Sequence, residues 1–147
     1  MPIELRRAAV TEMDPATLYR LLWLRVSVFV VEQRAAYAEL DGRDLESGAE
    51  LLWAEEEGHV LSTARVLREP DALRIGRVAT APEARSRGVA SAIMRAAVER
   101  CDEIGPGLPI LLDAQEHLVD WYARFGFVAE GERHFEDGIP HRVMRRP

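Results

Sequence analysis

Residues 85–90, Arg-Ser-Arg-Gly-Val-Ala, combine positive charge with small side chains. They connect a predicted strand, 73–80, to a predicted helix, 88–103. The first turn of a helix leaves backbone N–H groups unpaired and carries positive dipole character, so such a junction can bind a pyrophosphate. Gly88 allows the backbone to approach a ligand closely, and Ala90 keeps the next position small. A solvated helix start that carries surface arginines would have the same sequence.

Tyr122 is a second residue that could take part in a reaction. It belongs to a stripe with Leu118, Trp121 and Phe125 at helical spacing, which predicts an aromatic core stripe closed by a glycine C-cap at Gly126. For Trp121 and Phe125 this structural interpretation suffices. A tyrosine hydroxyl that reaches a cavity has a further use, because a phenol beside a thioester sulfur can act as the general acid for the leaving thiolate.

The single cysteine and the four histidines predict less chemistry. Cys101 excludes an internal disulfide, and its spacing from Ile93 and Ala97 is typical of a core residue on a helix rather than a nucleophile. The histidines show no paired spacing such as H-x-x-x-H, so no metal site is expected.

Composition restricts the kind of partner. The formal net charge of −6 disfavours a nucleic-acid binder, because phosphate neutralisation supplies most of that affinity. Neither a signal peptide nor a membrane span is predicted, and a cytoplasmic location is expected. All 19 basic residues are arginines, and five of them fall within 74–95 beside one acid, Glu83. An anion-attracting segment is therefore predicted in an acidic protein.

Hydrophobic periodicity and turn residues predict one domain over residues 1–147. In chain order the predicted elements are a strand at 3–9, a helix from Asp14-Pro15 to about 28–33, strands at 51–55, 60–67 and 73–80, a helix at 88–103, a strand at 109–113, a helix at 116–125, and a hairpin of 127–133 with 139–146. This order predicts a mixed α/β (α+β) fold with a mostly antiparallel central sheet and helices on both faces.

The 85–90 segment and the Tyr122 stripe, about 35 residues apart, resemble the coenzyme A and C-terminal tyrosine motifs of GNAT N-acetyltransferases. More narrowly, five blocks are similar to the ElaA-like branch: 21–33, Asp41-Gly42, 75–88, 114–127 and 136–144. The resemblance covers essentially the whole chain. It implies the GNAT acyl-CoA N-acyltransferase fold, with acetyl-CoA as co-substrate and no metal.

Carried over residue by residue, the resemblance implies a direct attack of an amine on the thioester in a ternary complex, with Tyr122 as general acid. Gln115 stands where many members have an asparagine that contacts the cofactor, and Ala90 where many have a second glycine. The residues implied to contact acetyl-CoA are Val78, Ala79 and Thr80, through backbone groups to the pantetheine, and Arg85, Ser86, Arg87, Gly88, Val89, Ala90 and Ser91 around the pyrophosphate.

The acceptor is a small-molecule or peptide amine of unknown identity, and a homodimer is possible in this family. Acidic loops at 39–50 and 55–57 favour a cationic acceptor. For each candidate acceptor-site residue or base, a structural hydrogen bond or a solvated side chain is the alternative; the candidates are Glu32, Gln33, Tyr37, Asp41, His117 and His141. A non-catalytic acyl-CoA-binding or interaction module with the same fold is the competing hypothesis.

Overall fold

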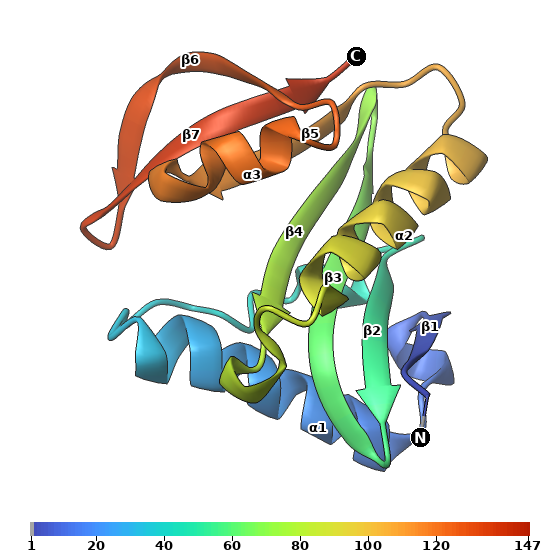
Figure 1. Cartoon of the computed structure of the whole chain (residues 1–147). Coiled ribbons are helices and arrows are strands. Elements are labelled where there is room, and N and C mark those ends of the chain that lie inside the picture. Colours follow the sequence, from blue (N-terminus) through green and yellow to red (C-terminus); the bar gives the residue numbers. More distant parts are fainter. Residues whose placement is uncertain (1) are drawn as a thin grey trace.

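The computed structural model describes residues 2–147, and a seven-stranded sheet forms its centre (Figure 1). The spatial order is β1-β2-β3-β4-β5-β7-β6, and every neighbouring pair is antiparallel except β4 and β5. The predicted mixed, mostly antiparallel fold is confirmed. The strands are β1 (Glu4–Ala8), β2 (Glu50–Glu56), β3 (His59–Glu69), β4 (Ala72–Thr80), β5 (Ile110–Gln115), β6 (Val128–Glu136) and β7 (Ile139–Arg146).

Helix α1 (Pro15–Val26) begins as its sequence predicts. The Asp14 carboxylate accepts a hydrogen bond of 3.1 Å from the Thr17 amide, and Pro15 occupies the first turn, where no amide partner is needed. The helix then widens into a π-helical turn, η2 (Ser27–Glu32). Such turns are rare in proteins, and those that occur often lie at functional sites.

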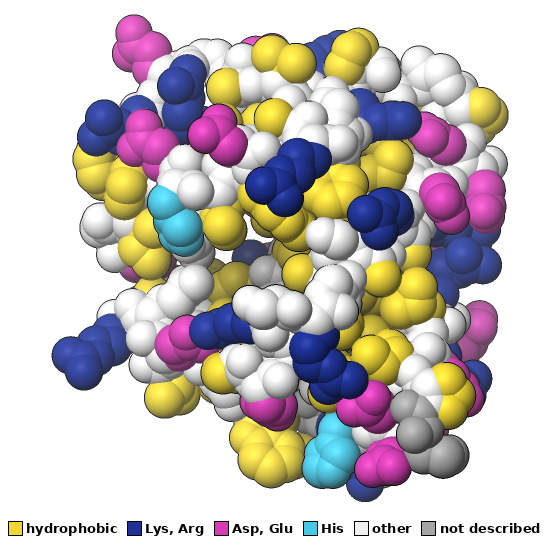
Figure 2. All heavy atoms as spheres, in the orientation of Figure 1, with side chains coloured by type: hydrophobic (Ala, Val, Ile, Leu, Met, Phe, Trp, Pro, Cys, Tyr) yellow, Lys and Arg dark blue, Asp and Glu magenta, His cyan; other side chains and the backbone are white. Residues whose placement is uncertain are grey.

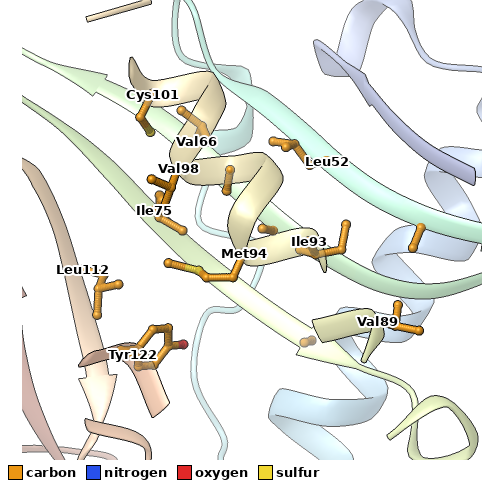
Figure 3. Close-up of a cluster of buried hydrophobic side chains, with 14 of the residues drawn as sticks. Leu52, Val66, Ile75, Val89, Ile93, Met94, Val98, Cys101, Leu112 and Tyr122 are labelled. Atoms are coloured by element: carbon orange, nitrogen blue, oxygen red, sulfur yellow. The ribbon is translucent and has the colours of Figure 1, made fainter. Parts of the chain in front are cut away.

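Helix α2 (Val89–Ile104) covers one face of the sheet, and its predicted inward positions are all buried (Figure 3). Cys101 is among them, and burial raises the pKa of its thiol to about 12. The thiol therefore stays protonated and unreactive, as expected for a core residue. On the other face, Leu21 of α1 packs against Leu51 and Trp53 of β2. Successive residues of β2 thus point to opposite sides of the sheet, toward α1 on one side and toward α2 on the other.

The predicted helix at 116–125 is shorter and less regular than expected. A 3₁₀ turn, η5 (Glu116–Leu118), precedes α3 (Val119–Ala123), and the chain leaves through Gly126 at φ 94°. A left-handed exit of this kind favours glycine. The remaining 3₁₀ turns are η1 (Val10–Glu12), η3 (Arg43–Leu45) and η4 (Pro82–Ala84). No helix within residues 2–147 is long and apolar enough to cross a membrane.

Candidate active site

Strands β4 and β5 pair over a very short distance and then part. Leu73 pairs with Ile110 and Arg74 with Leu111. Beyond these two pairs, β4 continues to Thr80 and β5 to Gln115 without pairing with each other. Figure 1 shows the two strands diverging. The parted strands leave backbone groups on facing edges for a ligand, as strand addition to a sheet edge requires.

A bulge reshapes β4 beside this opening. Arg65 pairs with Gly76 while Thr63 pairs with Ala79, so two residues of β4, Arg77 and Val78, oppose one of β3. Arg77 has a φ of 51°, in the left-handed region that non-glycine residues rarely adopt. A bulge re-aims the backbone and side chains that follow it. The backbone of residues 78–80 therefore turns along the opening.

The start of α2 presents free amides. Gly88, at φ 79°, is the N-cap residue, and no side chain caps the helix. A Cβ atom added at position 88 would meet no heavy atom within 4 Å. The left-handed backbone conformation therefore favours glycine there, and steric crowding does not. Residues 85–88 are exposed. An uncapped, exposed helix start of this kind is suited to a phosphate.

One cavity of about 750 Å³ connects these features. Figure 2 shows the hollow in this face of the molecule. Most residues singled out from the sequence line it: Glu32, Gln33, Tyr37, Asp41, Val78, Ala79, Thr80, Arg85, Ala90, Gln115, His117, Tyr122 and His141. Ser86, Arg87, Gly88, Val89 and Ser91 lie outside the lining, and the Val89 side chain points into the core.

Tyr122 lies at the inner wall of the cavity, with 7% of its surface exposed. The Trp121 ring packs edge-on against it at 4.9 Å between centroids. In Figure 3 the hydroxyl points away from Leu112 of β5 and toward β4. Burial raises the pKa of Tyr122 to about 12, so the phenol stays protonated and can donate a hydrogen bond.

The arginines of the 85–90 segment form ion pairs. Arg85 donates two hydrogen bonds of 2.8 Å to Glu32, and Arg87 donates two, of 3.0 and 3.4 Å, to Glu56. The hydrogen bond from Arg85 lowers the pKa of Glu32. Glu32 therefore has a structural partner and stays ionised, which makes it a weak proton acceptor.

Asp41 is also engaged with arginines. Arg65 reaches it at 2.9 Å and Arg77 at 3.1 Å, and the Arg77 guanidinium lies 5.4 Å from the centre of the Tyr37 ring. Burial alone would raise the pKa of Asp41, but the hydrogen bonds from Arg65 and the Arg43 amide, with the charges of Arg65 and Arg77, lower it to about 2. Asp41 holds the arginines and is unsuited to act as a base.

His141 is the buried histidine of the cavity. Its Nδ1 lies 2.9 Å from the Ile139 carbonyl oxygen, which can only accept, so Nδ1 carries the proton. Its Nε2 is then free to accept one. His141 of β7 lies opposite Gln115 of β5 in the sheet. The Gln115 side-chain amide donates a hydrogen bond of 3.0 Å to the Gln33 side-chain oxygen. His117, by contrast, is exposed.

Sequence reasoning missed Glu69 of β3 and three further acids of the lining, Asp113, Glu136 and Asp137. Asp113 follows an apolar run, and Glu136 and Asp137 precede Gly138, so these three were attributed to a strand end and a turn. The only signal was alternation along β5, which puts Asp113 on the same face as Gln115. The acids that the sequence did emphasise, in loops 39–50 and 55–57, are mostly neutralised by arginines: Glu39, Asp41, Asp44, Glu46, Glu50, Glu55 and Glu56.

Comparison with known proteins identifies the family to which this fold belongs. The model of the acetyltransferase (GNAT) domain family matches residues 19–146, so the chain belongs to the GNAT acetyltransferase family. The UPF0039 protein Rv2851c of Mycobacterium tuberculosis is 43% identical over 97% of this chain and 92% of its own length. Protein ElaA of Escherichia coli is 37% identical over 92% of this chain and 91% of ElaA.

Solved structures give the same result for the fold. The crystal structure of an acyl-CoA N-acyltransferase from Pseudomonas aeruginosa superposes with a TM-score of 0.94 at 36% identity, covering 99% of this chain and all of that one. Crystalline Escherichia coli ElaA gives a TM-score of 0.94 at 35% identity with the same coverage. The GNAT fold and the resemblance to the ElaA-like branch are confirmed.

Proposed function

We propose that this protein transfers the acetyl group of acetyl-CoA to an amine, which attacks the thioester carbonyl directly in a ternary complex. The observation that carries the proposal is the arrangement of the opening: an uncapped α2 start lies at one end, and a buried, protonated Tyr122 lies inside. Membership of the GNAT family supports acyltransferase activity.

The chain fits acetyl-CoA along the parted strands. The amides of 86–91 bind the pyrophosphate, and the backbone of 78–80 bonds the pantetheine in place of the missing strand pairing. Arg87 leaves Glu56 to contact a phosphate, since that ion pair is substantially exposed and weak, whereas Arg85 stays bonded to Glu32 and adds positive charge near the pyrophosphate. Gln115 lies at the thioester end, where it is already bonded to Gln33.

The reaction needs no enzyme nucleophile. The neutral amine forms the new C–N bond, the C–S bond breaks, and coenzyme A leaves as its thiol. His141 first takes a proton from the substrate ammonium through Nε2, which gives the neutral amine. As the C–S bond breaks, Tyr122 gives its proton to the sulfur and is reprotonated with the second proton that the nitrogen loses. Holding the two reactants in line supplies much of the rate enhancement.

The test compares thiol release from acetyl-CoA by the wild type and by Tyr122→Phe across a panel of amines. We expect kcat to fall about 100-fold in the variant, since only the proton donor is removed. Acetyl-CoA affinity should change little. Equal turnover by both proteins would contradict the role of Tyr122.

The competing function is a non-catalytic acyl-CoA-binding module. It requires that acetyl-CoA bind to the wild type while no amine increases thiol release above the rate with water. The protonated Tyr122 hydroxyl inside the cavity favours the enzyme.

A further inference from the structure

The two strands that form the opening end far from the point where they pair. Arg74 of β4 and Leu111 of β5 are their last pair, and the strands run on separately to Thr80 and Gln115. At about 3.3 Å per residue, these free lengths are roughly 20 Å for β4 and 13 Å for β5. No backbone pair between β4 and β5 joins their ends among residues 2–147. Another element must therefore fix how far apart the two ends lie.

The end of η2 contacts both strand ends. Glu32 accepts two hydrogen bonds of 2.8 Å from Arg85, and the Arg85 Nε donates one of 3.2 Å to the carbonyl oxygen of Thr80. The next residue, Gln33, accepts a hydrogen bond of 3.0 Å from the Gln115 side chain. Residues 32 and 33, here called the η2 bridge, therefore connect the end of β4 to the end of β5.

The π-helical geometry of η2 decides where the two side chains of the bridge point. The Gln33 amide donates a hydrogen bond of 3.2 Å to the Val28 carbonyl oxygen, five residues earlier, whereas an α-helical amide reaches the residue four earlier. The wider turn rotates the residues that follow it relative to α1. A plain α-helical continuation would turn Glu32 and Gln33 away from their present partners.

The η2 bridge joins the two halves of the proposed reaction centre. On the side of β4 lie the backbone groups of 78–80, which are proposed to bond the pantetheine. On the side of β5, Gln115 lies opposite His141 of β7, the proposed proton acceptor. A change in the separation of the strand ends thus moves the thioester relative to the base. A misplacement of about 1 Å can lower a rate about 100-fold.

We propose that Glu32 and Gln33 are positioning residues, which set the distance between the thioester and the attacking amine by joining the ends of β4 and β5. This inference rests on the proposed function and adds a role to it. Neither side chain transfers a proton. The hydrogen bond from Arg85 lowers the pKa of Glu32, and the Gln33 amide does not titrate.

The experiment measures kcat and KM with acetyl-CoA and the amine of the panel that the wild type acetylates fastest. Glu32→Ala and Gln33→Leu should each lower kcat about tenfold and change the KM for acetyl-CoA by less than about twofold, because they alter alignment and not cofactor binding. Gln33→Glu should keep most of the activity, since its carboxylate can still accept from Gln115.

A double-mutant cycle tests whether Glu32 acts through Arg85. Arg85→Ala should lower kcat at least as much as Glu32→Ala does. Adding Glu32→Ala to Arg85→Ala should cause no further loss, because both residues belong to one link. A direct contact of Glu32 with the acceptor would instead make the two losses additive.

Glu56→Gln is the matched control. Glu56 also pairs with an arginine of the 85–90 segment, but it lies on β2 and outside the cavity lining, so kcat should stay at the wild-type value. The urea midpoint of Glu32→Ala should also stay close to that of the wild type, because the pair with Arg85 is exposed and contributes little stability. A lower kcat at unchanged stability separates alignment from folding.

Three results would overturn the inference. They are unchanged kcat in both Glu32→Ala and Gln33→Leu, additive losses in the cycle with Arg85→Ala, and a higher KM for the amine with normal kcat, which would assign the η2 bridge to acceptor binding. Each of them leaves the acetyltransferase function standing. Failure of the proposed function is distinct, because then no amine raises thiol release by the wild type above the rate with water, and the inference falls with it.

Discussion

At the scale of single residues, burial sorts the ionisable groups of the cavity into donors and acceptors. The Tyr122 phenol is kept protonated by burial alone, whereas Glu32 and Asp41 are kept ionised by arginines. His141 has one ring nitrogen committed to a backbone carbonyl and the other open. We therefore propose His141 as the side chain that accepts the amine proton.

We expect His141→Gln to lower kcat about 100-fold while acetyl-CoA binding is retained, because general-base catalysis contributes at least that factor. His117→Gln is the matched control: it removes a histidine that also lines the cavity but is exposed. Steady-state kinetics with a saturating amine checks both variants. A large loss in the His117 variant with little loss in the His141 variant would reverse the assignment.

At the scale of elements, a buried ionic network fixes the loop after η2, which contributes Tyr37, Asp41 and Arg43 to the cavity lining. Arg25 of α1 is fully buried and reaches Glu39 at 2.9 Å and Asp44 at 2.7 Å. Arg65 and Arg77 join the same loop to β3 and β4 through Asp41. The loop after η2 is therefore held by charges on three elements, and a buried pair that loses one partner leaves a costly charge behind.

The pKa of Asp41, about 2 in the folded protein against 3.8 ordinarily, makes this contribution testable. A depressed pKa contributes stability above the unfolded value and loses it as pH falls through the folded one, so Asp41→Asn should cost about 2 kcal/mol near neutral pH. Urea unfolding at several pH values should show this difference shrinking from about pH 5 toward pH 2. The exposed Asp71→Asn is the control and should show almost no difference. A gap for Asp41→Asn that stays constant over this range would contradict the ionic explanation.

At the scale of the whole molecule, local sequence signals predicted the helices and strands but not how these elements pack to form the cavity. The Asp14-Pro15 start, the inward face of α2 and the glycine exit of α3 follow from patterns within a few residues. The widening of α1 into η2 was missed, because a π-helical turn depends on packing rather than on a residue pattern.

In the site, too, features encoded by neighbouring residues were predicted and features formed by distant residues were not. The α2 start was predicted because its chemistry is contiguous in sequence. The proximity of Asp113 and Glu136 was not predicted, because they come from strands separated by β7 in the sheet. The partners of Glu32 and Asp41 were equally hidden, since Arg85 and Arg65 are distant in the chain. Residue types indicated where charge lies, and only tertiary structure shows which charges are already paired.

The most direct test of the account is titration calorimetry of acetyl-CoA into the wild type, Gly88→Val and Gly88→Asn. The wild type should bind one molecule. Valine at the φ of 79° observed for Gly88 is strained, whereas asparagine tolerates this conformation, so valine should weaken binding about tenfold and asparagine much less. Absence of heat with the wild type, or equal affinity in all three proteins, would contradict the claim that the start of α2 holds the cofactor.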